Sequence, residues 1–346
     1  MTAALHEEAP AKVNLCLFLG PRRASDGRHE LVTVFQPVTL ADRVALEPAP
    51  LGADADAVSC PGVAGPPEAN LAAAALRAFR ARTGWAGPPV RLHIEKRIPV
   101  AAGMAGGSAD AGAALRLASR VAGVGDDDLL REVAFGLGAD VPAQVRPARY
   151  LATGAGEALR ALEGPPGDYG LLVLRVPEPL STADVYRRAD EMDLARGEAD
   201  LAERRRAVEA AGADLPDDLI VNDLEAAARA LCPAVDDALA AVRDAGAERA
   251  LVCGSGPTVV GLFRSVDAAR GAAVALGDRT PRPVVAAPWR GPATREAAAT
   301  SQTGFTPPQA RADAHRRRGD RRRRDRGLRH GRRQAAEPRG DADPRR

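Results

Sequence analysis

The sequence predicts an α+β protein built in two lobes. Its 346 residues are 45% hydrophobic, which is enough for a large core and, as a first expectation, for two domains. Some segments repeat apolar residues with strand spacing and others with helix spacing, but without the strict strand–helix–strand alternation of a doubly wound fold. A glycine- and alanine-rich loop at 99–107 joins a predicted strand to a predicted helix.

In the first half of the chain, strands are predicted before helices. Residues 12–20 alternate between two sets of side chains, one of them all Val or Leu, which is typical of a strand. A polar turn at 21–28 separates this segment from 29–44, where valines indicate one or two further strands. Apolar spacing and turn residues then predict a helix at 70–82, a strand at 90–95, a helix from about 108 to 122, and a helix from 126 to the glycines at 136 and 138.

The second half mixes short strands with helices. Residues 171–176 form an apolar run typical of a buried strand, and Ser181 with Thr182 can cap a helix. The charged segment 187–214 is predicted to be a solvated helical surface. The remaining predictions are helices at 222–231, 234–244 and 266–276, and two strands at 250–253 and 258–263.

Charge is distributed unevenly along the chain. The net charge is +2, but residues 291–346 hold 16 arginines against 7 acidic residues, so the first 290 residues carry about −7. The composition of 291–346 predicts a disordered basic tail. The four cysteines form no C-x-x-C pair, which favours reduced structural thiols. There is no long apolar run and no signal-peptide pattern, so we expect a soluble, cytoplasmic protein.

The loop at 99–110 is the strongest chemical feature of the sequence. It reads Pro-Val-Ala-Ala-Gly-Met-Ala-Gly-Gly-Ser-Ala-Asp, and its small residues let the backbone approach a ligand closely. A helix beginning here presents unpaired N–H groups and partial positive charge, which suit a triphosphate. Ser108 either caps that helix or reaches a phosphate or Mg²⁺. The alternative is a loop whose small residues only let the helix pack closely on the strand.

Two other phosphate-binding motifs are excluded by the sequence. The chain contains no G-x-x-x-x-G-K-[ST], so it is not a P-loop protein. None of its G-x-G pairs is followed by the third glycine of the dinucleotide fingerprint. The glycine loop is therefore neither a P-loop nor a dinucleotide fingerprint.

The order of several motifs resembles that of the GHMP kinases. Pro99, Gly103, Ser108 and Ala109 match the frame of the motif that wraps the ATP phosphates in that superfamily. The chain further resembles the branch that acts on 4-diphosphocytidyl-2-C-methyl-D-erythritol. The segments that carry this second resemblance lie at 11–15, 26–31, 94–99, 137–142, 153–157, 181–186, 222–225 and 254–257. Together they cover about residues 11 to 290.

The resemblance implies a two-lobed GHMP kinase fold with the active site in the cleft between the lobes. It implies an N-terminal ATP-binding domain at 1–155, a C-terminal domain at 156–290 and the tail at 291–346. The implied reaction phosphorylates the 2-hydroxyl of the CDP-linked polyol with ATP and Mg²⁺, in the non-mevalonate route to isoprenoid precursors. Such a transfer needs positioned phosphates, neutralised charge and a group that orients or deprotonates the hydroxyl.

Residue roles follow from the resemblance position by position. Asp140 would be the base, and Lys12 would hold its carboxylate ionised and stabilise the transferring charge. Ser108 would also help to hold Mg²⁺. The implied ATP-binding residues are Pro99, Ala101, Ala102, Gly103, Met104, Ala105, Gly106, Gly107, Ser108 and Ala109, with Asn70 and Lys96 at the adenosine. By spacing alone, a helix cap for Asp140 and a surface charge for Lys12 are the favoured interpretations, whereas the whole series of motifs favours the functional roles.

Substrate recognition is implied for three more residues. Asn14 would bind the polyol hydroxyls, His29 the cytidine, and Tyr186 the opposite side of the base. Structural roles are the alternatives: a buried histidine for His29 and core packing for Tyr186. The loop at 254–256 either closes over substrate or is only a hairpin turn.

Three residues depart from the family pattern. Met104 stands where Leu is usual, a swap of similar volume, and Ala105 where Gly is common, which limits the backbone. Arg28 replaces a Tyr that stacks on cytosine in the family, and a guanidinium can also stack on a base.

Two other functions compete with this interpretation. The first is another GHMP kinase, of the homoserine or mevalonate type, which the segments at 26–29 and 137–142 disfavour. The second is nonspecific nucleic-acid binding through the arginine tail, which has Phe305 as its single aromatic residue and no recognisable binding module. We expect a small-molecule substrate, no membrane partner, and a monomer or weak homodimer.

Overall fold

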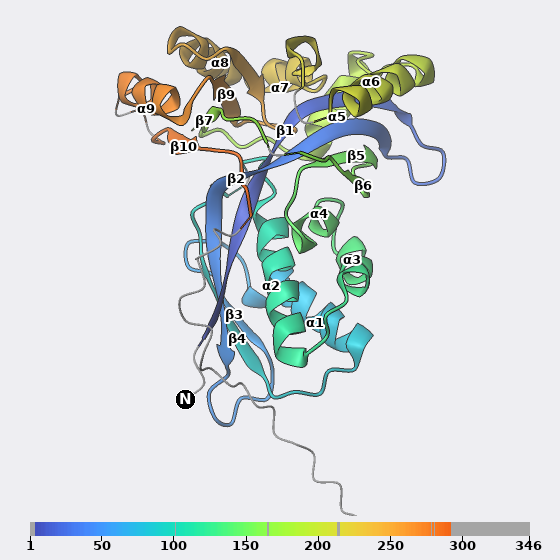
Figure 1. The fold of residues 1–346 in the computed structure, drawn as a ribbon, viewed down its shortest axis with the longest axis vertical. Helices are drawn as coiled ribbons and strands as arrows, with labels where there is room; N and C mark the ends of the chain where they lie inside the picture. Colours follow the sequence, from blue (N-terminus) through green and yellow to red (C-terminus); the bar gives the residue numbers. More distant parts are fainter. Residues whose placement is uncertain are drawn as a thin grey trace, which may run out of the picture. The chain divides into compact units, whose positions relative to one another are not determined.

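The computed structural model describes residues 4–100, 102–164, 166–212, 215–277, 279 and 281–291. Ala101 and the tail from residue 292 onward lie outside the described residues, so the predictions for them are not followed further. The described chain contains two sheets, each with its own helices (Figure 1). The predicted mixture of strands and helices is therefore confirmed.

The first sheet has six strands, and two of them are unusually long. Strands β1 (Leu5–Arg22) and β2 (His29–Pro48) pair antiparallel along most of their lengths, around a turn that begins after Arg22. Buried side chains form two large hydrophobic cores, and these two strands contribute to both. Val13 and Val34 pack in the first core, and Leu19 and Leu31 pack in the second. The other strands are β3 (Ala57–Ser59), β4 (Val90–Glu95), β5 (Tyr150–Gly154) and β6 (Ala158–Ala161), in the order β3-β4-β2-β5-β6.

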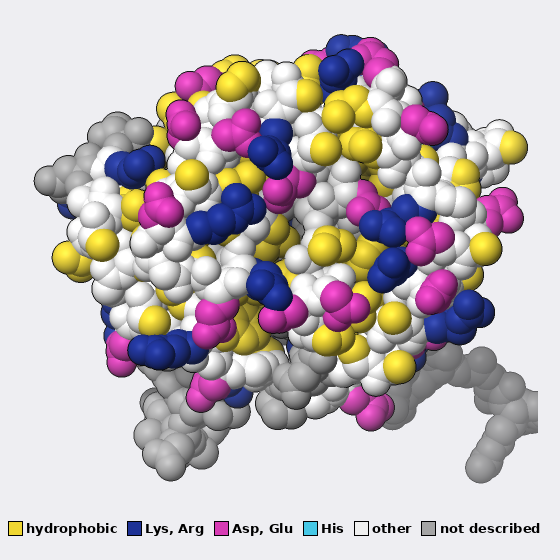
Figure 2. Space-filling view, turned by 90° about the horizontal axis from the view of Figure 1, so that it is seen from above, with side chains coloured by type: hydrophobic (Ala, Val, Ile, Leu, Met, Phe, Trp, Pro, Cys, Tyr) yellow, Lys and Arg dark blue, Asp and Glu magenta, His cyan; other side chains and the backbone are white. Residues whose placement is uncertain are grey.

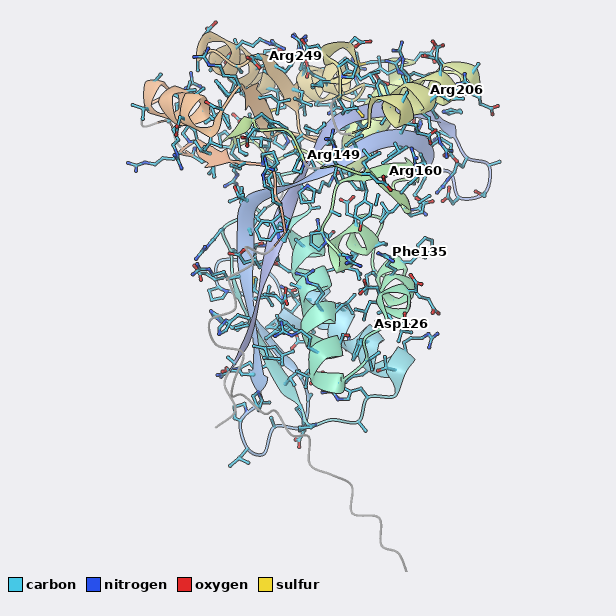
Figure 3. The ribbon with its side chains drawn as sticks, viewed as in Figure 1. Asp126, Phe135, Arg149, Arg160, Arg206 and Arg249 are labelled. Carbon is cyan, nitrogen blue, oxygen red and sulfur yellow. The ribbon has the colours of Figure 1, made fainter. Side chains whose placement is uncertain are left out.

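Four helices pack beside the first sheet (Figure 1): α1 (Leu71–Thr83), α2 (Gly106–Ala122), α3 (Asp127–Phe135) and α4 (Val141–Val145). Helix α2 is the central one, because most of its residues from Ala109 to Ser119 are buried. Gly112 lets it approach α4 closely, since a Cβ there would lie 2.4 Å from the carbonyl oxygen of Gln144. Figure 3 marks the two ends of α3, where Asp126 caps the start and Phe135 is the last residue. This packing holds α4 close against α2.

The second sheet is antiparallel, in the order β10-β7-β9-β8. Its strands are β7 (Gly170–Leu174), β8 (Arg249–Val252), β9 (Val259–Phe263) and β10 (Val284–Ala286). The accompanying helices are α5 (Thr182–Glu191), α6 (Glu198–Ala211), α7 (Glu225–Leu231), α8 (Ala234–Asp244) and α9 (Val266–Ala275). Short 3₁₀ turns lie at Pro67–Ala69 and Asp217–Leu219. None of the helices in the described ranges has the length and apolar character needed to cross a bilayer.

The sequence predicted most of these elements but not all of their bounds. Helices α1, α3, α8 and α9 lie within two residues of the predictions, and Asn70, Asp126 and Ser181 cap α1, α3 and α5 as their side-chain chemistry suggests. Strands β3, β5, β6 and β10 and helix α4 were not predicted. Helix α2 begins at Gly106, and its N-cap is Ala105 rather than Ser108.

Candidate active site

Lys12 and Asp140 meet although 128 positions separate them in the sequence. Lys12 lies in the middle of β1 and is only 6% exposed, so the interpretation as a surface charge is wrong. Its Nζ is 3.6 Å from Asp140 Oδ2, donates to Asn14 Oδ1 at 2.9 Å, and lies 4.6 Å from the centre of the Phe35 ring. A buried ammonium needs such partners, because an unpaired one would carry a large desolvation penalty.

Asn14 belongs to a short chain of hydrogen bonds that fixes this lysine. Its Nδ2 donates to Thr33 Oγ1 at 2.7 Å, and the Thr33 hydroxyl donates to the Cys16 carbonyl oxygen at 2.6 Å. All three side chains are buried. The amide of Asn14 is thereby oriented with its oxygen toward Lys12.

Asp140 is the residue immediately before α4, and it follows Gly138, whose φ is +154°. Although this is the N-cap position, the carboxylate accepts no capping hydrogen bond, so the helix-cap interpretation does not describe the side chain. Its side chain is 35% exposed and faces Lys12. A half-exposed carboxylate beside a buried cation can receive a proton from an approaching hydroxyl.

The glycine loop before α2 is held next to this pair. The backbone N–H of Lys12 donates to the carbonyl oxygen of Met104 at 3.1 Å. Ala105 adopts the left-handed conformation, φ +55°, and caps α2 without a side-chain hydrogen bond. The first N–H groups of α2 therefore have no capping side chain and can serve an anionic ligand.

A second loop from the C-terminal half closes on the first one. Gly103 has φ +68°, and a Cβ on it would lie 2.5 Å from the carbonyl oxygen of Cys253. A Cβ on Gly254 would lie 3.2 Å from the carbonyl oxygen of Gly103 and 3.5 Å from Asn14 Oδ1. Asn222 supports this loop, because its Nδ2 donates to the carbonyl oxygens of Val252 and Gly254, both at 2.7 Å. The 254–256 loop is therefore more than a hairpin turn, since it contacts the glycine loop directly.

A cavity of about 670 Å³ opens beside the glycine loop. Its wall includes most of the predicted ATP-binding residues, namely Asn70, Lys96, Pro99, Ala102, Gly103, Met104, Ala105, Gly106 and Gly107. Ser108 and Ala109 are not part of that wall; Ala109 is fully buried and Ser108 half-buried in the first turn of α2. The volume is that of a typical small-molecule site.

An ionic cluster that sequence reasoning missed lies at the cavity wall. Lys96 Nζ donates to Asp42 Oδ2 at 2.5 Å and to Asp110 Oδ2 at 2.7 Å, and Asp42 Oδ1 also accepts from the backbone N–H of Ile98. Burial, reinforced by the nearby charge of Asp42 and opposed by Lys96, raises the pKa of Asp110 to about 7. Burial alone would lower the pKa of Lys96, but the two carboxylates outweigh it and the pKa is raised. Asp42 could have been noticed in the sequence, because it is a charged residue within the apolar pattern of β2.

His29, at the start of β2, and Tyr186, in α5, lie next to each other. Their ring centroids are 5.7 Å apart with the planes tilted by 38°. Burial raises the pKa of Tyr186 to about 12, and the charge of Asp140 adds to the effect. Arg28 instead points to Asp26 in the β1–β2 turn, with Nε 2.9 Å from Oδ2.

Two family models match the chain: GHMP kinases N terminal domain over residues 70–146 and GHMP kinases C terminal over residues 198–280. The 4-diphosphocytidyl-2-C-methyl-D-erythritol kinase of Anaeromyxobacter sp. (strain K) is 44% identical over 279 residues, which is 78% of this chain and 84% of that protein. The chain belongs to the GHMP kinases, in the family of 4-diphosphocytidyl-2-C-methyl-D-erythritol kinases.

Other members of the family give a consistent result. The kinase of the same name from Streptomyces coelicolor is 43% identical over 75% of this chain and 87% of its own. A crystal structure of 4-(cytidine 5'-diphospho)-2C-methyl-D-erythritol kinase superimposes with a TM-score of 0.67 at 33% identity, covering 82% of this chain and 98% of the other. Homoserine kinase from Cytophaga hutchinsonii has a TM-score of 0.63 at 16% identity, with 84% and 95% covered, a likeness of fold alone.

Proposed function

We propose that this GHMP kinase transfers the terminal phosphoryl group of ATP to the 2-hydroxyl of 4-diphosphocytidyl-2-C-methyl-D-erythritol, in the non-mevalonate route to isoprenoid precursors. The observation that carries the proposal is the buried Lys12 facing Asp140, with its backbone bonded to the glycine loop. This arrangement puts a cation and a base where a phosphate-binding loop ends, which is what phosphoryl transfer to an alcohol requires.

The cavity beside the glycine loop would hold the nucleotide. Asn70 and Lys96, which line the cavity, would face the adenosine, and the N–H groups at the start of α2 would bind the phosphates. Magnesium keeps several waters and prefers a few oxygen ligands together with phosphates, so the Ser108 hydroxyl in the first turn of α2 is suited to assist it. Bound with ATP, the ion would neutralise phosphate charge.

Asp140 would accept the proton of the attacking hydroxyl, and Lys12 would stabilise the charge that develops during transfer. Lys12 needs no rearrangement for this role, because Asn14 and Phe35 already hold its ammonium in place. Preorganised charge of this kind costs no reorganisation when the reaction occurs.

The acceptor substrate would lie along the face that runs from Asp140 past Tyr186 to His29. Asn14, beside Lys12, would bind the polyol hydroxyls, and His29 with Tyr186 would enclose the cytosine. Arg28 is 54% exposed and sits in the turn, so a stacking role for it would require its release from Asp26.

The alternatives from the sequence are less well supported. The homoserine kinase and the mevalonate kinase of Methanococcus jannaschii share only 16% and 12% identity with this chain. The tail that would bind nucleic acid lies outside the described residues. On the face shown in Figure 2, basic and acidic side chains are interspersed rather than gathered into one basic patch. The division at 1–155 and 156–290, the cytoplasmic location and the monomer or weak homodimer stay predictions.

Release of ADP from Mg-ATP in the presence of the CDP-linked polyol tests the proposal, with homoserine and mevalonate as competing acceptors. We expect turnover with the CDP-linked polyol alone, and a loss of roughly 10²- to 10⁴-fold in kcat for Asp140→Asn. Turnover that survives this substitution would remove Asp140 as the base but keep the kinase. Turnover only with another acceptor would refute the proposed substrate.

A further inference from the structure

The segment 221–223 lies alongside β1, although it belongs to the C-terminal half of the chain. The Leu17 N–H donates to the carbonyl oxygen of Val221 at 2.8 Å, and the Asp223 N–H donates to the carbonyl oxygen of Leu17 at 2.9 Å. Asn222, the central residue of the segment, is thereby fixed against the same strand that carries the proposed catalytic lysine.

The side chain of Asn222 is buried and makes hydrogen bonds with both ends of its amide. Its Oδ1 accepts from the Leu224 N–H at 3.0 Å, which turns Nδ2 toward the loop that follows β8. Nδ2 donates to the carbonyl oxygens of Val252 and Gly254, both at 2.7 Å. Among the short side chains, only asparagine offers two donors together with an acceptor. The chemistry of this position therefore requires an amide.

These hydrogen bonds complete a closed ring of contacts that starts and ends at β1. The strand is joined to the glycine loop, because the Lys12 N–H donates to the carbonyl oxygen of Met104. The glycine loop in turn meets the 254–256 loop, since a Cβ on Gly254 would lie 3.2 Å from the carbonyl oxygen of Gly103. The Asn222 amide joins that second loop back to β1. The glycine loop is thus supported from two sides.

We propose that Asn222 is a positioning residue for phosphoryl transfer, because its amide sets the place of the 254–256 loop and, through it, the place of the glycine loop beside Lys12. If the amide donors were lost, the glycine loop would keep its bond from Lys12 but lose its second support. A misplacement of about 1 Å at a reacting centre can cost about 10²-fold in rate. The inference rests on the proposed function, in which the glycine loop binds the phosphates of ATP.

Asn222→Asp tests this role, because the carboxylate keeps the shape of the amide but turns acceptor atoms toward the two carbonyl oxygens. In the full-length protein, kcat/KM for the CDP-linked polyol should fall by roughly 10²-fold. The Kd of ADP, measured by titration calorimetry, should rise severalfold, because the phosphate-binding loop is displaced. If Asn222→Asp does not fold, Asn222→Ala removes the donors without adding a charge and should have the same two effects.

A double-mutant cycle with Gly103→Ala separates positioning from a general structural role. Both substitutions disturb the contact between the same two loops, so the combined variant should lose less activity than the product of the two single losses, by roughly fivefold or more. Ser119→Ala is the matched control, because this hydroxyl is as buried as the Asn222 amide and donates to the carbonyl oxygen of Val124 at the far end of α2. It should lower the thermal midpoint, leave kcat/KM unchanged and show no coupling to Gly103→Ala.

The outcomes distinguish this inference from the proposed function. Wild-type kcat/KM in the Asn222 variant, or single losses that simply multiply in the combined variant, overturns the positioning role and leaves the proposed function intact. A wild-type protein that does not turn over the CDP-linked polyol removes the proposed function instead. ADP binding then still decides the role of Asn222, because a Kd equal to that of the wild type would show that the glycine loop does not depend on its amide.

Discussion

Gly103 offers the sharpest test of how the two loops are fitted together. In Gly103→Ala the new side chain must adopt φ +68°, which costs roughly 1–2 kcal/mol for a residue with a Cβ. The same Cβ would lie 2.5 Å from the carbonyl oxygen of Cys253 and 3.3 Å from that of Gly256, so backbone on the opposite loop must move. Overpacking of this kind costs about 1–3 kcal/mol. Together the two effects predict a destabilisation of about 2–5 kcal/mol.

Urea unfolding measures the change in the free energy of unfolding. Initial rates at varied concentrations of ATP and acceptor measure the effect on the site. We expect both KM values to rise in Gly103→Ala, because the loop it displaces contacts the phosphate loop and Asn14. Gly107→Ala is the matched control for the stability measurement: it lies in the same loop region, within the first turn of α2, and a Cβ there meets nothing within 4 Å. Alanine should be neutral or slightly stabilising at that position. Wild-type unfolding and kinetics in Gly103→Ala would refute the interlocked-loop reasoning.

Three further substitutions test single features of the site. Lys12→Met should lower kcat by roughly 10²-fold or more, which steady-state kinetics would measure. The variant should still fold, because Asp140 remains partly solvated, and a thermal melt would check this. Ala105→Gly relieves a φ of +55° and should raise the unfolding free energy by up to about 1 kcal/mol in urea. Because the pKa of Asp110 is raised, the folded state keeps this carboxyl protonated to a higher pH than the unfolded state does. The contribution of Asp110 to the free energy of unfolding should therefore fall as the pH rises from about 4 to about 7. In Asp110→Asn, urea midpoints over that range should lack this fall; a stability difference from wild type that is constant with pH would contradict the assignment.

The local elements were accessible from the sequence because their signals are local. Helix α8 was predicted with its observed bounds, Ala234–Asp244, from apolar spacing between a proline and a glycine. Helix α4 has only five residues, too few for a helical period to appear, and strand β6 is mostly exposed, so alternation gave no guide. Short elements of this kind exist because tertiary packing supports them, as Gly112 and Gln144 do for α4.

The site was predictable only in part, for a related reason. The spacing of Lys12 and Asp140 along the chain says nothing about their 3.6 Å approach, and the resemblance to GHMP kinases supplied the pairing. Asp42 and Asp110 were missed because their importance lies in the shared Lys96 rather than in any motif.

The arrangement around Lys12 explains why segments from opposite ends of the chain must fold together before the site exists. The lysine backbone bonds Met104 of the glycine loop, its ammonium bonds Asn14 and faces Asp140, and Gly254 approaches both Gly103 and Asn14. No one of these segments can place the ammonium alone, because its burial is tolerable only when its partners are present. The same contacts that make burial of Lys12 tolerable therefore fix the glycine loop relative to Asp140, the proposed base. Catalytic geometry and folding are in this way consequences of one set of contacts, and a substitution such as Gly103→Ala should perturb both together.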